Sequence, residues 1–334
     1  MSSASQDEGV GPAEANIMTV DVEDWFHILE VEGGYQRSDW GSLESRVERN
    51  TERLLALFER QRTSATFFIV GWVAWKYPRL VRTIAEAGHE IASHSFWHEV
   101  IRRHDRNSLA ADLGASRRLL EDLSGTAVRG FRAPGGSITP LEAWAFDVML
   151  EEGYRYDSSL CPGVSSHGGY PSPHYGPHMI KCEGGLLAEI PSSTVSIGAR
   201  RVPYAGGGYL RLFPAALIDY CIRGDNRAGR PSTVYVHPRE IDPDQPRMEL
   251  SALRRFKYYV GLRSTEAKLE SMLAKHRFTS ASEWLEAHRD TISERVLDVR
   301  SHALSGVVPP DPSLLPPPPP SASELATATA APGG

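Results

Sequence analysis

The stretch GHEIASHSFWHEVI, residues 88–101, contains the signals around which the rest of the chain can be interpreted. Its apolar run HEIASH has the length of a short buried strand and ends on His94. His94 and His98 are four residues apart, a spacing that would place both imidazoles on one face of a helical turn. Two neutral imidazoles on one side can bind a single metal ion. The pair alone is a weak signal, because one histidine could cap or pack while the other is solvated.

Strand-like and helix-like segments alternate on both sides of this stretch. Short apolar runs lie at 17–22, 65–70, 89–94, 127–134, 154–159, 186–192 and 232–237. Helical spacing is found at 43–62, 75–88, 107–125, 139–153, 213–224, 263–276 and 281–298. Strands and helices that alternate in this way predict an α/β fold with a parallel sheet and helical crossovers. A doubly wound sheet and a barrel both fit the alternation.

Polar residues at the strand ends favour the barrel. Five charged or titratable side chains fall at or just past the carboxyl end of five different predicted strands, namely Asp21, His94, Arg132, Asp157 and His237. The carboxyl ends of the strands in a (β/α) barrel converge on one face, where the chemistry of such folds takes place. We therefore expect a distorted, TIM-like (β/α)7 barrel.

An acidic cluster follows the first predicted strand, in TVDVEDWFH. Asp21, Glu23 and Asp24 are so close in sequence that they repel one another unless a cation or retained protons lie among them. One of these carboxylates could complete a metal site with His94 and His98, leaving an open position for water. The alternative is an acidic loop in solvent.

Composition narrows the class of protein. A formal net charge of −6 disfavours a nucleic-acid partner. The three cysteines are far apart and form no C-x-x-C pair, which disfavours a disulfide framework. The N-terminus lacks the basic start and apolar run of a secretory signal, and no stretch reaches the roughly 18 apolar residues of a membrane span. These features predict a cytoplasmic protein, although some export routes leave no simple signal.

The two ends of the chain differ from its middle. Residues 1–15 are polar and predict a disordered lead. Residues 301–334 predict a flexible proline-rich tail, because the five prolines 316–320 cannot join a helix or a central strand. Such a tail can act as a tether or dock a proline-reading partner. Residues 16–300 are then the folded domain.

Five motifs in this order resemble a known family. They are DVED at 21–24, HSFWH at 94–98, FRAPGG at 131–136, YDSS at 156–159 and VYVHP at 234–238. The chain resembles the polysaccharide deacetylases with a NodB-homology domain, carbohydrate esterase family 4. The part after about residue 195, with GGGYLRLFP and YVHPREID, looks closest to the deacetylases found beside exosortase and exopolysaccharide gene clusters.

The resemblance implies a role for each matching residue. Asp21 would be the general base, paired with Arg132, and His237 the general acid, oriented by Asp157. His94 and His98 would bind the metal with Glu23. The chain has D-x-E-D where the family most often has two adjacent aspartates. The register of a D-x-D variant therefore favours Glu23 as the acidic ligand, with Asp24 as its rival.

Other matching positions concern the substrate. The turn after Pro134 would supply a backbone N–H to the oxyanion, with Gly135 allowing a close approach. Trp25 and Trp97 flank the supposed ligands and could stack on sugar rings, as could Phe26 and Phe96. For two of these four aromatic residues, core packing is at least as good an interpretation. Tyr235, where the family often has leucine, would alter the acyl pocket.

The resemblance implies a metal-dependent hydrolase that removes N-acetyl groups from amino sugars of a polysaccharide or its precursor. Zinc suits two imidazoles and a carboxylate, and cobalt, nickel or iron would also fit. Two alternatives stay open: a related C–N hydrolase of the allantoinase-like type or an O-acetyl esterase, and a barrel that only binds carbohydrate. The expected partner is an N-acetylated saccharide, and a homo-oligomer stays open.

Overall fold

The computed structural model describes residues 15–29, 34–163, 168–198, 200–299, 316–321 and 323–325. The predicted disordered lead lies outside the described residues except for Ala15. Most of the predicted proline-rich tail also lies outside them, apart from 316–321 and 323–325.

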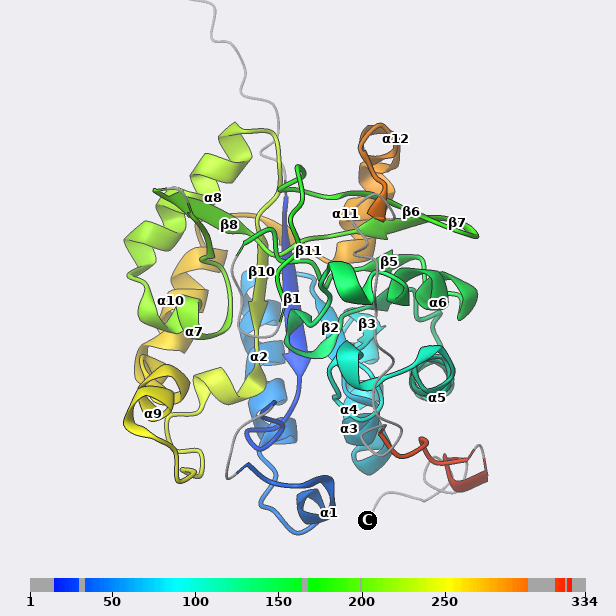
Figure 1. The fold of residues 1–334 in the computed structure, drawn as a ribbon. Coiled ribbons are helices and arrows are strands. Elements are labelled where there is room, and N and C mark those ends of the chain that lie inside the picture. Colours follow the sequence, from blue (N-terminus) through cyan, green and yellow to red (C-terminus); the bar gives the residue numbers. More distant parts are fainter. Residues whose placement is uncertain are drawn as a thin grey trace, which may run out of the picture.

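Seven parallel strands run side by side through the centre of the molecule (Figure 1). Their order is β10 (Thr233–Val236), β1 (Asn16–Val22), β2 (Thr66–Ile69), β3 (Glu90–Ser93), β4 (Gly130–Phe131), β5 (Tyr156–Asp157) and β7 (Gly185–Glu189). The prediction of an α/β fold built on a parallel sheet is therefore confirmed. All seven residues of β1 are buried, as expected for a strand covered on both faces.

The remaining strands extend this sheet or lie apart from it. β6 (His178–Cys182) pairs antiparallel with β7, β12 (Val296–Leu297) pairs with β6, and β11 (Phe278–Thr279) pairs with β1. β8 (Thr194–Ile197) and β9 (Arg200–Pro203) form a separate hairpin. Among the described residues no strand ladder joins β7 to β10. The segment after β7 bridges that gap, because Thr233 N donates to Ser193 Oγ at 2.7 Å.

Helices surround the strands (Figure 1). They are α1 (Arg37–Trp40), α2 (Val47–Gln61), α3 (Gly71–Lys76), α4 (Pro78–Glu86), α5 (Arg106–Ser124), α6 (Ala145–Glu151), α7 (Gly207–Leu212), α8 (Ala215–Arg227), α9 (Ala252–Tyr259), α10 (Leu262–Leu273), α11 (Ala281–Ala287) and α12 (Arg289–Ser293). α5 shows how local sequence sets the bounds. Asp105 accepts from Ser108 N at its start, and Gly125 adopts a left-handed φ of 69° at its end.

Three predicted helices differ from the observed ones. The helix at 75–88 is divided before Pro78, which starts α4. The helix at 139–153 begins as a 3-10 turn, Pro140–Glu142, before α6. The single helix at 281–298 is wrong: α11 and α12 are followed by β12, whose Val296 and Leu297 pair with β6. Tertiary strand pairing overrides the local helical pattern there.

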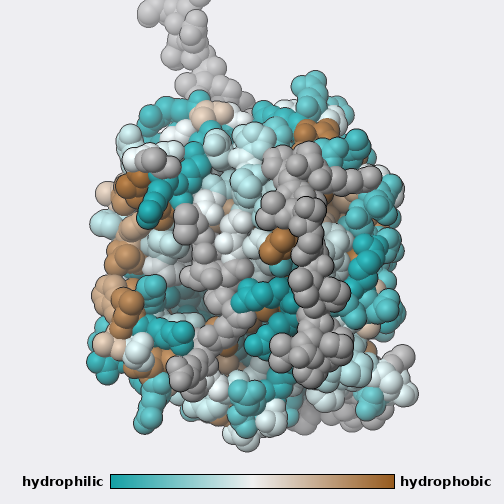
Figure 2. Space-filling model, in the orientation of Figure 1, coloured by the Kyte–Doolittle hydropathy of each residue, from teal (hydrophilic) through white to brown (hydrophobic). Residues whose placement is uncertain are grey.

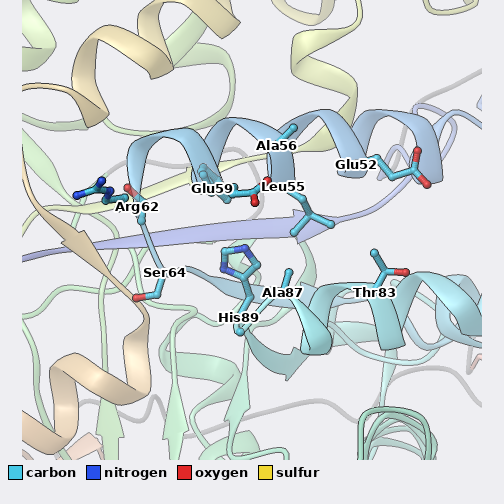
Figure 3. Close-up of a pocket in the computed structure, with 12 residues that line it drawn as sticks. Glu52, Leu55, Ala56, Glu59, Arg62, Ser64, Thr83, Ala87 and His89 are labelled. Atoms are coloured by element: carbon cyan, nitrogen blue, oxygen red, sulfur yellow. The ribbon is translucent and has the colours of Figure 1, made fainter.

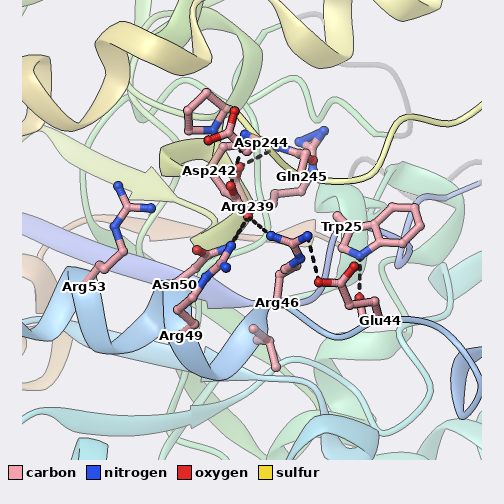
Figure 4. A network of polar contacts seen from close by, with 12 residues as sticks. Trp25, Glu44, Arg46, Arg49, Asn50, Arg53, Arg239, Asp242, Asp244 and Gln245 are labelled. Carbon is pink, nitrogen blue, oxygen red and sulfur yellow. Dashed lines mark hydrogen bonds and ion pairs between the residues drawn. The ribbon is translucent and has the colours of Figure 1, made fainter.

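A polar network fixes the turn that follows β10. Asp242 ends the 3-10 helix Pro238–Ile241 and accepts from Arg49 at 3.0 Å and from Asn50 at 3.2 Å, both on α2 (Figure 4). Gln245 Nε2 donates to the carbonyls of Arg239 and Asp242, which closes the turn. The turn, which contains Glu240, is thereby held against α2.

Replacement of Leu54 by alanine should lower the free energy of unfolding by about 2–5 kcal/mol, because this leucine of α2 is fully buried in the core. Urea denaturation followed by circular dichroism measures the change. Glu59→Ala, at an exposed position of the same helix, is the control and should change stability by less than about 0.5 kcal/mol. Equal stability of the two variants would contradict the packing described for α2.

Candidate metal centre

A cavity of about 440 Å³ opens at the carboxyl ends of the parallel strands. Its lining combines acidic, imidazole and guanidinium side chains from distant parts of the chain: Asp21, Glu23, His94, His98, Arg132, His237 and Glu240 are among them. Charged groups gathered in one cavity of this kind mark a candidate functional site.

A second hollow, of about 570 Å³, lies at the opposite, amino end of β2 and β3 (Figure 3). The end of α2 and the segment before β3 line it, with Glu52, Glu59, Arg62 and His89 among the polar residues. Its single histidine, His89, packs against Phe67, and its Nδ1 accepts from Ala65 N at 3.3 Å. None of the predicted site residues lines this hollow, so we place the candidate site in the cavity at the other end.

Glu23, His94 and His98 form the ligand group of the candidate site. One ligating atom from each lies within 4.8 Å of the others, and within the described ranges no other group of three such residues meets this condition. Glu23 Oε2 is 2.5 Å from His98 Nε2. Glu23 follows β1, whereas both histidines follow β3, so the group depends on two strands of the sheet.

The protonation of these residues suits a cation. Burial lowers the pKa of His94 to about 4, so its ring is neutral near pH 7. Its Nδ1 lies 2.8 Å from the carbonyl oxygen of Arg132 and must therefore donate, which leaves Nε2 as the free lone pair. Burial would raise the pKa of Glu23, but His98 and His237 lower it well below its usual range. A neutral nitrogen donor beside an ionised carboxylate fits zinc or a similar divalent metal.

The two histidines do not share a helical turn, contrary to the prediction from their spacing. No helix covers 94–98; instead Ser95 and His98 adopt left-handed φ values of 64° and 53°. The buried Asp112 of α5 holds this loop by accepting from Phe96 N at 2.8 Å and Ser95 Oγ at 3.2 Å. The loop bends so that the rings of His94 and His98 approach to 5.1 Å between centroids. The histidines meet, but for a different reason from the one predicted.

Asp24, the predicted rival of Glu23, faces elsewhere. Its carboxylate accepts from Ser45 Oγ at 2.5 Å and from the backbone N–H groups of Arg46 and Val47. Asp24 therefore caps the start of α2, and the structure brings only Glu23 to the histidines.

Asp21 and Arg132 lie together as the resemblance implied. Arg132 Nη1 donates to Asp21 Oδ1 at 2.6 Å and to Thr19 Oγ1 at 2.8 Å. Arg132 Nε and Nη2 donate to the carbonyl oxygen and the Oγ of Ser158, and the guanidinium lies 4.2 Å from the centroid of the Phe68 ring. Only Oδ2 of Asp21 then faces His237, whose Nε2 is 3.8 Å away.

The carboxylate beside Nδ1 of His237 is that of Glu240. The geometry does not match the prediction that Asp157 orients this ring. Glu240 Oε2 lies 3.3 Å from His237 Nδ1, an ion-pair contact without hydrogen-bond alignment, and it also accepts from His237 N. Burial would lower the pKa of His237, but the surrounding carboxylates, Glu23 first, raise it to about 9. Glu240 is fully buried, and Arg211 Nε donates to it at 2.8 Å.

Asp157 instead supports the turn beside the cavity. It is buried and accepts from Ser159 Oγ at 2.6 Å, while Ser159 Oγ in turn accepts from Ala133 N at 2.8 Å. Burial raises the pKa of Asp157 and of its buried neighbour Glu189. Asp157 thus ends its strand as predicted, but it is connected through Ser159 to the turn 133–136 rather than to the imidazole.

The predicted substrate-contacting residues divide into two pairs. Gly135 and Tyr235 line the cavity, and Gly135 has a left-handed φ of 65°. Trp25 is buried, donates from Nε1 to the carbonyl of Glu44 and packs against Phe26. Trp97 packs beside Phe96, and the guanidinium of Arg37 lies over its ring. Neither tryptophan lines the cavity, so the geometry favours core packing over sugar stacking for both.

Three residues of the cavity were missed from the sequence. Glu240 stands three residues after His237, and a capping-box spacing could have revealed it. Arg211 is buried and comes from α7, and no local pattern connects it with Glu240. His27 also lines the cavity, and its Nδ1 accepts from Asp24 N. Its buried Nε2 has no hydrogen-bond partner among the residues that the structure describes.

Residues 38–155 match the sequence profile of the polysaccharide deacetylase family. This part of the chain is therefore similar to a polysaccharide deacetylase domain. Residues 158–286 match a second profile, described as a domain of unknown function, DUF3473. His94, His98 and Arg132 lie within the first match, whereas His237 and Glu240 lie within the second. The candidate site thus draws residues from both matched segments.

Curated proteins named as deacetylases are also similar to part of this chain. The chain is 31% identical over 108 residues to a peptidoglycan deacetylase of Helicobacter pylori, a match that covers 32% of this chain and 36% of the relative. It is 31% identical over 100 residues to a chitooligosaccharide deacetylase of Sinorhizobium fredii, covering 30% of this chain and 44% of that protein. The chain spans less than half the length of these relatives.

Solved structures share the fold. The crystal structure of a Mycobacterium smegmatis protein, assigned as a polysaccharide deacetylase, matches with a TM-score of 0.58 at 20% identity. The match covers 86% of this chain and 96% of that one. The PuuE allantoinase matches with a TM-score of 0.54 at 16% identity, covering 84% and 91%. Both likenesses support the barrel-like α/β fold. Among the helices of the described ranges, none is both long and apolar enough to cross a bilayer.

Asp112→Asn should weaken metal binding by about 10–100-fold, because it removes one carboxylate acceptor that holds the loop of His94 and His98. Competition with a zinc-binding dye measures the affinity. Asp122→Asn, at an exposed position of the same helix, is the matched control. Unchanged affinity in a folded Asp112→Asn chain would show that Asp112 does not position the ligands.

Proposed function

We propose that this chain is a divalent-metal-dependent hydrolase that removes N-acetyl groups from amino sugars of a polysaccharide or its precursor. The observation that carries the proposal is the joint placement of three functions in one cavity: a ligand group, a carboxylate held by arginine, and an imidazole with a raised pKa. The deacetylase domain match and the deacetylase relatives support the same chemistry.

Glu23, His94 and His98 would hold the metal, which when bound supplies Lewis-acid polarisation of the acetyl carbonyl and lowers the pKa of a water molecule. Asp21 would accept the proton of that water. Because Arg132 occupies Oδ1 at 2.6 Å, Oδ2 is the oxygen left for the proton. Arg132 therefore fixes the orientation of the base.

His237 would donate the proton to the leaving amine from Nε2. This atom faces the cavity, 3.2 Å from Glu23 Oε1 and 3.8 Å from Asp21 Oδ2, whereas Nδ1 faces Glu240. Burial would lower its pKa, but the carboxylates of Glu23 and Glu240 raise it to about 9, which favours the protonated imidazole that a general acid requires. Glu240, held by Arg211, would be the residue that orients this ring.

The turn 133–136 would bind the oxyanion through the N–H of Gly135. The N–H of Ala133 already donates to Ser159 Oγ, the N–H of Gly136 donates to the carbonyl of Ala133, and Pro134 has none. Gly135 lines the cavity with its left-handed backbone. Asp157, through Ser159, supports this turn.

We further propose that residues 16–300 form one catalytic unit, with a family-specific part from about 195, and that the proline-rich tail is a tether. A cytoplasmic location would favour a nucleotide- or lipid-linked precursor as substrate, in keeping with the resemblance to deacetylases of exopolysaccharide clusters. A secretion signal preceding this sequence would contradict that location.

The proposal is tested by acetate release from a panel of N-acetylhexosamine oligosaccharides with zinc-, cobalt-, nickel- or iron-reconstituted protein. Release is expected to need the metal and to fall by at least about 1,000-fold in His94→Ala, since loss of metal activation removes several kcal/mol from the transition state. A wild type that binds metal tightly but releases no acetate from any sugar would contradict N-deacetylation. Release that persists in His94→Ala would contradict the metal site.

Glu240→Gln should lower kcat by roughly 10–100-fold with little change in KM, because it removes the charge that holds the protonated imidazole of His237. Asp157→Asn should have the smaller effect on kcat, since Asp157 binds Ser159 and reaches the turn 133–136 only through it. Steady-state kinetics measures both, with metal affinity and the thermal transition as checks on folding, and Glu240→Asp should restore part of the rate. A larger kcat loss in Asp157→Asn would return the orienting role to Asp157.

A further inference from the structure

Helix α9 has an unusual environment for a helix of this protein. None of its eight residues is buried, and the seven residues 251–257 are all exposed. Two of them are large and apolar: Leu253 is 66% exposed and Phe256 is 54% exposed. Since they are three residues apart, they lie on one face of the helix.

The C-terminal end of α9 is nevertheless held firmly to the body of the protein. Arg211 donates to the carbonyl oxygens of Lys257, Tyr258 and Val260 at 2.7–3.2 Å. Tyr259 Oη accepts from Met248 N at 2.9 Å, and the guanidinium of Arg239 lies over the ring of Tyr258. The helix is thus anchored by its tyrosines and its last carbonyls, while Leu253 and Phe256 stay largely exposed among the described residues.

Apolar exposure continues on the neighbouring helices. Leu212 at the end of α7 is 47% exposed, and Leu217 and Tyr220 of α8 are 41% and 66% exposed. Figure 2 shows brown atoms along the edge of the molecule where α7, α8 and α9 lie in Figure 1. Leu212 and Phe256 also line the cavity, and Leu253 shares a face of α9 with Phe256. We refer to these three residues as the α9 patch.

The segment that contains α9 is rich in exposed basic side chains. Arg254, Arg255, Lys257 and Arg263 are exposed, and the sequence 251–264 contains no acidic residue. The chain as a whole carries a net charge of −6, so this positive region is local. A short helix with exposed leucine and phenylalanine among arginine and lysine is the pattern of segments that lie in the interface of an anionic bilayer.

The patch adjoins the candidate site. Leu212, Phe256 and Lys257 line the same cavity as the metal ligands, at the strands' carboxyl end. We propose that the α9 patch and its basic residues bind the surface of an anionic lipid bilayer. If the proposed deacetylase function holds, this contact would bring the cavity to saccharides attached to that bilayer; the contact itself follows from exposure and charge alone.

The test is co-sedimentation of the purified full chain with vesicles. Vesicles of equal parts phosphatidylglycerol and phosphatidylcholine should bind the wild type, and pure phosphatidylcholine vesicles should bind it far less. Removal of three charges in Arg254→Gln/Arg255→Gln/Lys257→Gln should lower the partition coefficient about 100-fold, at about five-fold for each basic residue. Leu253→Ser/Phe256→Ser should lower it at least about ten-fold.

Two controls separate this inference from the proposed function. Leu186→Ser/Ile197→Ser removes two other exposed apolar side chains, 46% and 57% exposed, and should bind vesicles as the wild type does. His94→Ala should also bind as the wild type does, because the contact needs no metal site. Its loss of activity with retained binding would separate the two claims.

The inference is overturned if the wild type does not sediment with anionic vesicles, or if Leu253→Ser/Phe256→Ser binds as tightly as Leu186→Ser/Ile197→Ser. A concentration-dependent dimer that Phe256→Ser disperses, without vesicle binding, would overturn it in favour of contact between two copies of the chain. Equal binding to neutral and anionic vesicles would overturn the role given to the basic residues.

Discussion

The geometry of the candidate site depends on the buried guanidinium of Arg132. A charge with 6% exposure must be paired and fully hydrogen-bonded, or its desolvation would oppose folding. Arg132 meets this requirement by joining β1, through Thr19 and Asp21, to the end of β5, through Ser158. Its own carbonyl oxygen accepts from His94 Nδ1. One residue therefore orients the proposed base on one side and a proposed metal ligand on the other.

A second buried arginine has the same function for the proposed acid. Arg211 holds Glu240, and Glu240 faces His237, so the imidazole lies between carboxylates and gains a raised pKa. The carbonyl oxygens that end α9 bind this same guanidinium. The proposed acid, the helix at the cavity mouth and the segment of unknown function at 158–286 are thus connected through one side chain.

The sequence predicts the parallel sheet and the residues at its carboxyl edge, because buried strands have apolar runs and their polar ends converge. Asp21, Glu23, His94, His98, Arg132 and His237 come together in the structure as that reasoning expects. It fails where a contact depends on tertiary direction. The spacing of His94 and His98 suggested a helix, but left-handed backbone at Ser95 and the carboxylate of Asp112 produce the approach. That Glu240 and not Asp157 lies beside Nδ1 of His237 likewise depends on which way two buried side chains turn. The capping-box spacing of His237 and Glu240 was the one local signal of this contact.

The proposed function requires that Glu23, His94 and His98 hold one divalent metal, and this requirement can be examined directly. It is tested most directly by a crystal structure of the chain grown with zinc, using anomalous difference maps from data collected on both sides of the zinc absorption edge. We expect one strong peak within about 2.0–2.2 Å of a carboxylate oxygen of Glu23, Nε2 of His94 and a nitrogen of His98. A peak at Asp24 or elsewhere, or no peak at these three residues, would contradict it.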